Sequence, residues 1–354
     1  MAAILPLTAG MVNHSGCSHR PECQKINAAS HKPHWHVLGA GAMGCLWAAR
    51  LWQWAQGAAM DWGQPPVCLL LHKADSLQRW QQTGGLHLYE RSTGTALPVP
   101  AMLVQQIQEP ISLLLVCTKA QDTLPALASV KDHLNSGTRI VLLQNGLRVQ
   151  DEVRQQFPQQ AVYCLSTSHG AYLRSPFHVV HAGQGEAWLG NLSTPGQEAE
   201  QDLLTLLPQR QMQIQWERDI RARLWDKFAV NCAINALSVI HNCRNAELLT
   251  RPDAHAELQA LCKEIEALLM ALPQAPTPAA VYPRARSVLQ ATAQNFSSTL
   301  QDARAGRDTE MPYLNEYLCE LAQQAALPCP RNTELIQRFN TRVAALRAGL
   351  QPCP

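Results

Sequence analysis

The sequence predicts an α/β region followed by an all-α region, and three observations carry this prediction. A glycine-rich turn, Gly39–Gly44, follows a short apolar segment that begins at Trp35 and precedes a longer helical pattern. Further short apolar segments alternate with helical patterns, which is typical of a parallel sheet covered by helices on both faces. From about Asp219 onward only helical patterns follow. We therefore predict a Rossmann-type N-terminal domain, a parallel sheet with an antiparallel extension, and then an all-α C-terminal domain.

The predicted strands of the parallel sheet are short and apolar. After HWHVL at 34–38 come VCLLLHK at 67–73, ISLLLVCTK at 111–119 and RIVLLQNG at 139–146. Three later segments are linked by short turns, at 161–173, 177–183 and 186–190. We expect these later segments to be strands that extend the sheet in antiparallel fashion.

The second domain is predicted to contain helices only. Helical patterns cover 220–240, 257–272, 287–303, 315–327 and 334–350, with a proline-rich linker at 274–283. We place the boundary at 218, so that residues 34–218 form the α/β domain and residues 219–354 the helical domain. Residues 1–33 are expected to be a disordered N-terminal extension.

Length and composition exclude several classes of protein. The 354 residues suffice for about two domains. Charged residues make up only 16% and the formal net charge is +2, so neither nucleic acid nor a membrane surface is expected as a general partner. No apolar run approaches the roughly 20 residues of a membrane span, and the start lacks the positive segment of a signal peptide. We expect a cytoplasmic protein.

The twelve cysteines do not form a recognisable disulfide or metal framework. Several stand inside apolar runs, where a free thiol packs like a small hydrophobic side chain; these include Cys117, Cys164 and Cys232. There is no CxxC pair, and one His/Cys cluster has a spacing that matches no zinc pattern, namely His14, Cys17, His19 and Cys23. We expect no metal site.

The glycine-rich turn carries the first chemical signal. Its residues are Gly39, Ala40, Gly41, Ala42, Met43 and Gly44. Between a strand and a helix, Gly39 permits a tight turn, Gly41 lets a diphosphate approach the backbone, and Gly44 allows close packing of helix and strand. The diphosphate then rests on the helix N-terminus. The alternative is an ordinary strand–helix turn, but the position favours a dinucleotide site.

The residues that follow the second strand bear on the choice between NAD and NADP. An acidic side chain there binds the ribose 2′-hydroxyl, whereas a basic one accommodates a 2′-phosphate. This chain has His72 and Lys73, and no carboxylate until Asp75. These residues favour NADP, unless both are merely solvated.

Two other strands end in polar residues. In open α/β sheets, ligands bind outside the carboxyl ends of the strands. Lys119 ends one such segment, and Asn145 precedes Gly146 in another. Both are candidates for the cofactor or substrate site, although a strand-end lysine is often simply exposed and Asn-Gly is a common turn.

The segment 224–240 is the most informative of the helical region. Lys227, Asn231 and Asn235 follow one another at intervals of four and therefore lie along one face of a helix. The rest of the segment is largely apolar, so the helix should be buried on most sides. Buried amines and amides are costly without partners. We predict that this face lines a polar cavity; the alternative is a narrow solvent-exposed stripe.

A second polar cluster follows, with members Ser297, Ser298, Asp302, Arg307 and Glu310. Gly306 and Thr309 precede Glu310, which predicts that a new helix starts there. The dipole of that helix would help to keep the carboxylate ionised. By itself this cluster is a weak signal.

Taken together, these segments resemble the ketopantoate (2-dehydropantoate) reductase family over roughly residues 35–346. The matching segments are HVLGAGAMGCLWAARL, LLLVCTKAQ, LLQNG, STSHGAY, HAGQGEAWLG, RARLWDKFAVNCAINALSVIHNCRNAEL and NFSSTLQDARAGRDTE. The lysine–asparagine–asparagine helix and the last segment are specific to that family, whereas the glycine motif alone is not.

The resemblance implies a role for each candidate in the helical region. Lys227 would be the catalytic lysine, and Glu310 the partner of the substrate hydroxyl. Asn231, Asn235 and Ser298 would bind the substrate.

The resemblance also implies roles in the α/β domain. Asn145 would line the nicotinamide and substrate site, and Lys119 the cofactor cleft. The chain departs from the family at His72, where a member can carry an arginine for the 2′-phosphate; Lys73 stands beside it.

The implied activity is the NADPH-dependent reduction of ketopantoate, a small 2-keto acid, to pantoate in pantothenate and coenzyme A biosynthesis. Lys227 would protonate the oxygen on which charge develops, a role suited to a lysine whose pKa is lowered by burial. Two alternatives remain: a reductase or opine-type dehydrogenase of another keto or imino acid, and a non-catalytic NADP(H) sensor. An oligomer is possible.

Overall fold

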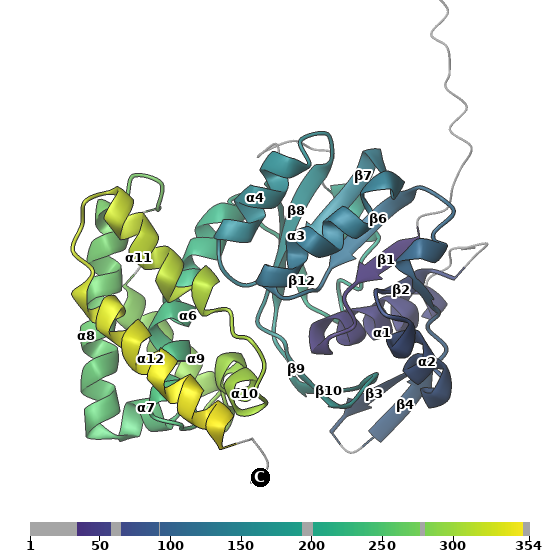
Figure 1. Ribbon diagram of the computed structural model, residues 1–354. Helices are drawn as coiled ribbons and strands as arrows, with labels where there is room; N and C mark the ends of the chain where they lie inside the picture. The colour runs from purple at the N-terminus through teal and green to yellow at the C-terminus, as the bar shows by residue number, and fades with distance from the viewer. Residues whose placement is uncertain (1–33, 58–64, 92, 193–200, 277–279, 350–354) are drawn as a thin grey trace, which may run out of the picture. The chain divides into compact units, whose positions relative to one another are not determined.

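The computed structural model describes residues 34–57, 65–91, 93–192, 201–276 and 280–349 (Figure 1). The extension 1–33, with its His/Cys cluster, lies outside the described residues. Within the described ranges, no helix is both long and apolar enough to cross a bilayer.

The larger sheet has eight strands in the order β12-β11-β8-β7-β6-β1-β2-β5. From β5 to β8 neighbouring strands pair in parallel, β11 runs antiparallel to β8, and β12 is parallel to β11. The bounds are β1 (Trp35–Leu38), β2 (Val67–Leu71), β5 (Ala101–Leu103), β6 (Ile111–Val116), β7 (Leu134–Leu142), β8 (Ala161–Thr167), β11 (Ala187–Asn191) and β12 (Ile214–Trp216). Every residue of β1 and β2 is buried, as expected of central parallel strands covered on both faces. The predicted α/β fold class is confirmed.

A second sheet of four strands was not anticipated from the sequence. Its order is β4-β3-β10-β9, with bounds β3 (Leu86–Glu90), β4 (Thr93–Leu97), β9 (Gly170–Ser175) and β10 (His178–Gly183). The segment 161–173, expected as one strand of the main sheet, is divided between β8 and β9. Strand β9 pairs with β10, and β10 pairs with β3, so neither joins the main sheet. The antiparallel extension therefore consists of β11 and β12 alone.

Helices cover both faces of the main sheet. Buried residues of α1 belong to one core cluster, and those of α3 and α4 belong to another. Alternate residues of the central strands join one cluster or the other, so the two clusters lie on opposite faces of the sheet. The helices are α1 (Ala42–Gly57), α2 (Ala74–Thr83), α3 (Ala120–Ser129), α4 (Arg148–Gln156) and the short α5 (Gln201–Thr205).

The remaining described chain is helical, as predicted. Its elements are α6 (Ile220–Ile240), α7 (Glu247–Thr250), α8 (Pro252–Ala271), α9 (Val281–Ala291), α10 (Ser298–Arg304), a 3₁₀ turn at Met311–Tyr313, α11 (Asn315–Gln324) and α12 (Pro330–Ala348). The boundary proposed at 218 lies between β12 and α6.

Helix α6 is the centre of this region. It begins after Asp219, whose Oδ1 accepts a hydrogen bond from the Ala222 amide at 3.0 Å, a stabilising N-cap. Helices α8, α9, α10 and α12 pack around it, and it also contacts β8 and β11 of the sheet (Figure 1). Because α6 is surrounded on most sides, its polar residues cannot all face bulk water.

The helix predicted at 287–303 is interrupted. Helix α9 ends at Ala291 and α10 begins at Ser298. Between them the backbone carbonyls of Ala293 and Asn295 accept hydrogen bonds from the amides of Ala246 and Asn245. Pairing with this neighbouring segment replaces the helical bonds that a continuous helix would make.

Candidate active site

The glycine turn has the geometry that a bound diphosphate requires. Gly39 has a φ of 103°, and a Cβ on Gly44 would lie 1.8 Å from the Gly39 carbonyl oxygen. Both positions therefore need glycine, the first for its backbone angle and the second for close packing. A Cβ on Gly41 would meet nothing within 4 Å, so the space beside this residue is open to a ligand. The turn, together with Ala40, Ala42 and Met43, fits a dinucleotide at the start of α1.

The basic residues after β2 are free to meet a ligand. His72 and Lys73 are both exposed, and Lys73 occupies the N-cap position of α2 without making a side-chain cap. A cation at this strand end is suited to a phosphate on the adenosine ribose.

Lys227 projects from α6 toward the end of β8. Its Nζ donates a hydrogen bond of 2.9 Å to the carbonyl oxygen of Thr167, the last residue of β8. Burial lowers the pKa of this lysine to about 8, and the opposing attraction of Glu310 only partly offsets that effect. The ammonium group is thus held in place and made more acidic than an ordinary lysine.

Glu310 joins the helical region to the strand ends of the α/β region. Its carboxylate accepts hydrogen bonds from Asn145 Nδ2 at 3.0 Å and from the backbone amide of Ala120 at 3.4 Å. Burial raises the pKa of this carboxyl, while these hydrogen bonds and Lys227 oppose the rise.

The expected helix start at Glu310 is wrong in detail. Only the 3₁₀ turn Met311–Tyr313 follows directly, and α11 begins at Asn315. The amide that Glu310 contacts belongs to Ala120, the first residue of α3. A helix N-terminus does face this carboxylate, but it is that of α3 in the α/β region and not that of a helix starting at Glu310. Its pKa is raised, moreover, because desolvation outweighs the favourable contacts.

Asn231 and Asn235 share the Lys227 face of α6. Asn235 is 9% exposed, and Asn231 is partly buried. Within the described part of the chain, neither side-chain amide forms a hydrogen bond with another protein group. Neither amide is among the fully buried polar atoms that lack a partner in the described chain, so the donors and acceptors of both asparagines are accessible to a ligand.

The serine pair at the start of α10 is divided between two roles. Ser297 is the N-cap of α10, and its Oγ accepts a hydrogen bond from the Leu300 amide at 3.0 Å. The same Oγ lies 2.5 Å from Ser238 Oγ on α6. Ser298 is exposed. The capping hydroxyl is therefore committed to structure, and Ser298 is the one left free.

Lys119, expected at the cofactor cleft, contacts the segment that precedes Glu310. Its Nζ lies 3.0 Å from Asp302 Oδ2 and donates at 2.7 Å to the Asp308 carbonyl. Asp302 also accepts from Arg307 Nε at 2.8 Å. Lys119 thus ties the strand-end loop to the segment that carries Glu310.

Several contacts of the site could not be found from side-chain patterns. The Thr167 carbonyl and the Ala120 amide are backbone groups, which any residue provides. Asp302 was visible in the sequence cluster, but its ion pair with Lys119 joins residues far apart in the chain.

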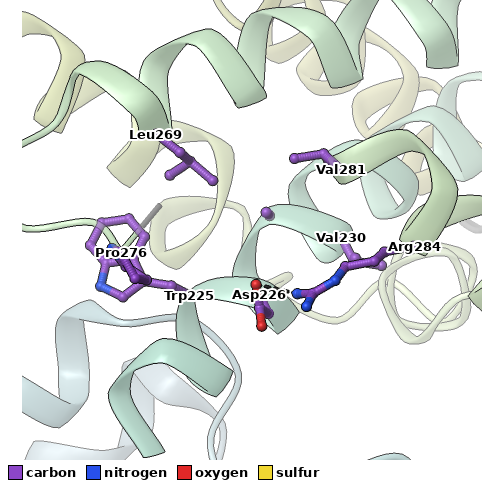
Figure 2. A pocket seen from close by; sticks show the side chains of 8 residues that line it. Trp225, Asp226, Val230, Leu269, Pro276, Val281 and Arg284 are labelled. Carbon is purple, nitrogen blue, oxygen red and sulfur yellow. Dashed lines mark ion pairs between the residues drawn. The ribbon is translucent and has the colours of Figure 1, made fainter. Parts of the chain in front are cut away.

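The opposite face of α6 offers no room for a substrate. Figure 2 shows a cavity there between Trp225, Leu269 and Val281, with Asp226 and Arg284 forming an ion pair at its edge. Its volume is about 10 Å³, enough for a single water molecule at most. Asp226, although adjacent to Lys227 in sequence, therefore belongs to the packing of α6 on α9.

Among the described residues, no group of three or more His, Cys, Asp or Glu side chains is arranged to hold a metal ion. The arrangement instead combines a dinucleotide turn, an acidified lysine and unpartnered amides. These features define a Rossmann-type oxidoreductase with a helical region that completes the site.

Comparisons with known proteins specify the family. The family model for ketopantoate reductase PanE/ApbA matches residues 35–194, and the model for its C-terminal part matches residues 219–342. The 2-dehydropantoate 2-reductase of Shigella flexneri is 31% identical over 327 residues, which cover 89% of this chain and 97% of that protein. The enzyme of the same name from Yersinia pestis is 29% identical over 322 residues, with the same coverage. The chain belongs to the ketopantoate reductase PanE/ApbA family.

Solved structures agree with the fold. A PanE/ApbA family ketopantoate reductase from Ralstonia eutropha JMP134 has a TM-score of 0.77 at 24% identity, covering 89% of this chain and 99% of that one. D-mandelate dehydrogenase in complex with NADH and anilino(oxo)acetate has a TM-score of 0.78 at 21% identity, covering 88% and 99%.

Proposed function

We propose that this protein reduces 2-dehydropantoate (ketopantoate) to pantoate with NADPH, a step of pantothenate and coenzyme A biosynthesis. The observation that carries the proposal is the α6 face, where Lys227 is held by Thr167 and faces Glu310 beside two unpartnered amides. Residues 34–218 are proposed to hold the cofactor, and residues 219–354 the substrate and catalytic groups.

The glycine turn is proposed to bind the cofactor diphosphate through the open backbone at Gly41. His72 and Lys73 would contact the 2′-phosphate, which is the basis for preferring NADPH over NADH. The nicotinamide, when bound, supplies the hydride. Asn145 would line its site, and Lys119 would face the cofactor after exchanging its contacts with Asp302 and the Asp308 carbonyl.

Lys227 is proposed as the general acid. Reduction of a keto group places negative charge on its oxygen, and an adjacent ammonium both stabilises this charge and delivers a proton. A pKa of about 8 leaves most of the lysine protonated at neutral pH while making the proton easier to transfer than from an ordinary lysine. The hydrogen bond to the Thr167 carbonyl orients the Nζ atom.

The other groups are proposed to hold the substrate. Asn231, Asn235 and Ser298 would hydrogen-bond its carboxylate and hydroxyl groups, and Glu310 would accept a hydrogen bond from the hydroxyl that forms. The Asn145 and Ala120 contacts keep the Glu310 carboxylate in position for that role.

The test is oxidation of NADPH by the purified protein with a panel of 2-keto acids. We expect the highest kcat/KM with 2-dehydropantoate, and little activity with phenylglyoxylate, the keto acid that corresponds to mandelate. A preference for phenylglyoxylate or an imino acid would reassign the substrate. Tight NADPH binding without turnover of any member of the panel would favour a sensor.

A further inference from the structure

Two cysteines of the helical region lie in contact outside the candidate active site. Cys319 is on α11, and Cys329 directly precedes α12. Their sulfur atoms are 3.3 Å apart, so a covalent bond of about 2.05 Å would need an approach of only about 1.2 Å. Both are partly exposed, whereas six of the seven other described cysteines are buried. The pair therefore combines proximity with access.

The surroundings give the two sulfurs different chemistry. Glu264 of α8 occupies the N-terminus of α12, where its carboxylate accepts from the Arg331 amide at 2.9 Å and the Asn332 amide at 2.8 Å. Cys329 Sγ also donates toward Glu264 at 3.7 Å. A thiolate at Cys329 would lie beside this carboxylate, so Cys329 is favoured as the neutral thiol.

Cys319 is the sulfur better able to carry a negative charge. When the single hydrogen of the Cys329 thiol points to Cys319 instead of Glu264, this hydrogen bond holds the pKa of Cys319 below its ordinary value, while the pKa of Cys329 is raised. Nucleophilic attack requires a thiolate. Because the two pKa values shift in opposite directions, Cys319 is the better nucleophile toward an oxidant, and Cys329 is the thiol that then closes the disulfide.

We propose that Cys319 and Cys329 form a redox-active dithiol whose substrate is a hydroperoxide. The Cys319 thiolate attacks the peroxide, giving a sulfenic acid and releasing hydroxide (an alcohol or alkoxide from an organic hydroperoxide). The Cys329 thiol then displaces water from the sulfenic acid, and the disulfide forms. For hydrogen peroxide the sum is two thiols and one peroxide giving one disulfide and two waters, so the sulfurs lose the two electrons that the peroxide gains.

The disulfide would close the connection between α11 and α12. Asn315, the first residue of α11, donates to the Cys232 carbonyl on α6 at 2.9 Å and to Asn332 Oδ1 on α12 at 2.8 Å. Oxidation would therefore crosslink two helices that the Asn315–Asn332 hydrogen bond already joins. Closing a loop of this length constrains the unfolded chain, and we expect the melting temperature of the full chain to rise by a few degrees.

The test is titration of the reduced, full-length protein with hydrogen peroxide, followed by peptide mapping with mass spectrometry. We expect a Cys319–Cys329 disulfide to form before any other cysteine is oxidised. In Cys329→Ser, the sulfenic acid at Cys319 should accumulate and react with dimedone; in Cys319→Ser, Cys329 should stay reduced at the same peroxide dose.

Cys117→Ser is the matched control, because Cys117 is also partly exposed but lies elsewhere in the fold. This variant should form the Cys319–Cys329 disulfide as the unmodified protein does. The proposal is overturned if Cys117 is oxidised first, if Cys329 rather than Cys319 gives the dimedone adduct, or if peroxide produces no Cys319–Cys329 link in folded protein.

Discussion

Two clusters of buried polar side chains connect a helix to neighbouring strands, and they differ in whether their hydrogen bonds are complete. In one, Arg50 of α1 donates hydrogen bonds to Glu90 on β3 and to His181 on β10. In the other, α6 carries Lys227 toward Glu310 and the end of β8. Both clusters contain a largely buried cation, Arg50 or Lys227, so burial of a cation alone does not distinguish a structural cluster from an active site.

The Arg50 cluster is nearly saturated. Arg50 reaches Glu90 at 2.5 and 3.2 Å and His181 Nδ1 at 2.9 Å. His181 Nε2 lies 3.1 Å from His169 Nδ1, and His169 Nε2 lies 3.0 Å from the Met212 carbonyl. Arg50 Nε is left without a partner. Burial lowers the pKa of both histidines and favours their neutral forms. Each neutral ring can then accept a hydrogen bond at Nδ1 and donate one from Nε2, His181 to His169 and His169 to the Met212 carbonyl.

The Lys227 cluster is open by comparison. The lysine and the glutamate have partners, but the amides of Asn231 and Asn235 have none within the described residues. A network whose groups bond one another stabilises the fold, whereas accessible amides without protein partners are available to hydrogen-bond a ligand. The comparison predicts that substitutions in the open cluster change catalysis and that substitutions in the saturated cluster change stability.

The largest effect is expected from Lys227→Ala. If Lys227 supplies the proton, kcat with 2-dehydropantoate should fall by about 10²–10⁴-fold, or ~3–5 kcal/mol of transition-state stabilisation. NADPH affinity and the melting temperature should stay near those of the unmodified protein. A folded variant with undiminished kcat would show that Lys227 takes no part in the mechanism. The contrast between a catalytic Lys227 cluster and a structural Arg50 cluster would then fail.

The pH dependence of the same lysine gives the next largest effect. Its pKa of about 8 means that the protonated form, needed for reduction, is lost as the pH rises above this value. The rate should therefore decline about tenfold per pH unit on the alkaline side. A profile of kcat/KM measured between neutral and alkaline pH tests this, because kcat/KM reports the groups of the free enzyme; a flat profile across that window would contradict a general-acid lysine.

Asn235→Ala probes the unpartnered amides. Loss of one substrate hydrogen bond should raise KM for the keto acid by about tenfold, in keeping with ~1.5 kcal/mol, the lower end of the range for a bond to a charged group. The melting temperature should not fall, because the amide has no protein partner to lose. Asn315→Ala is the matched control: Asn315 bonds the Cys232 carbonyl and Asn332, so stability rather than KM should suffer.

Local spacing explains why the arrangement of the candidate residues along each element was predictable. The intervals between Lys227, Asn231 and Asn235 define a helix face without knowledge of what packs against it. The glycine turn likewise needs only a preceding strand and a following helix. Such patterns lie within one element, so the sequence alone displays them.

Contacts between distant segments were not predictable in the same way. The pairing of Lys119 with Asp302 and of Glu310 with the Ala120 amide depends on how α3 meets the helical region. The second sheet was missed because β3 and β4 are short and lie far in sequence from β9 and β10. The break at 292–297 arises from hydrogen bonds to Asn245 and Ala246, which no local propensity reveals.

A smaller effect is expected at the cofactor end. Lys73→Ala should raise KM for NADPH by about 3- to 10-fold, the worth of one exposed charge contact of roughly 1 kcal/mol, and leave KM for NADH little changed. Parallel kinetics with both cofactors provide the measurement. Equal use of NADPH and NADH by the unmodified protein would show that His72 and Lys73 do not select the phosphate.

The smallest effect on turnover is expected from Arg50→Ala, which tests the saturated cluster. Removing the guanidinium deprives Glu90 and His181 of their shared donor, and hydrogen bonds that involve a charged group contribute about 1.5–3 kcal/mol. Because Glu90 is 41% exposed and water can replace part of the loss, the free energy of unfolding should fall toward the lower end of that range. Stability is measured by denaturant unfolding, and kcat at a temperature where the variant remains folded.

Arg50→Lys is the control for that experiment. A lysine keeps the positive charge beside Glu90 but cannot bond both Glu90 oxygens and His181 Nδ1 in the planar arrangement of a guanidinium. Stability should therefore fall between that of the unmodified protein and that of Arg50→Ala, while kcat with 2-dehydropantoate stays within about twofold in both variants. A large fall in kcat in folded Arg50→Ala would show that the two clusters are coupled. A complete set of hydrogen bonds would then no longer distinguish a structural cluster from a catalytic one in this chain.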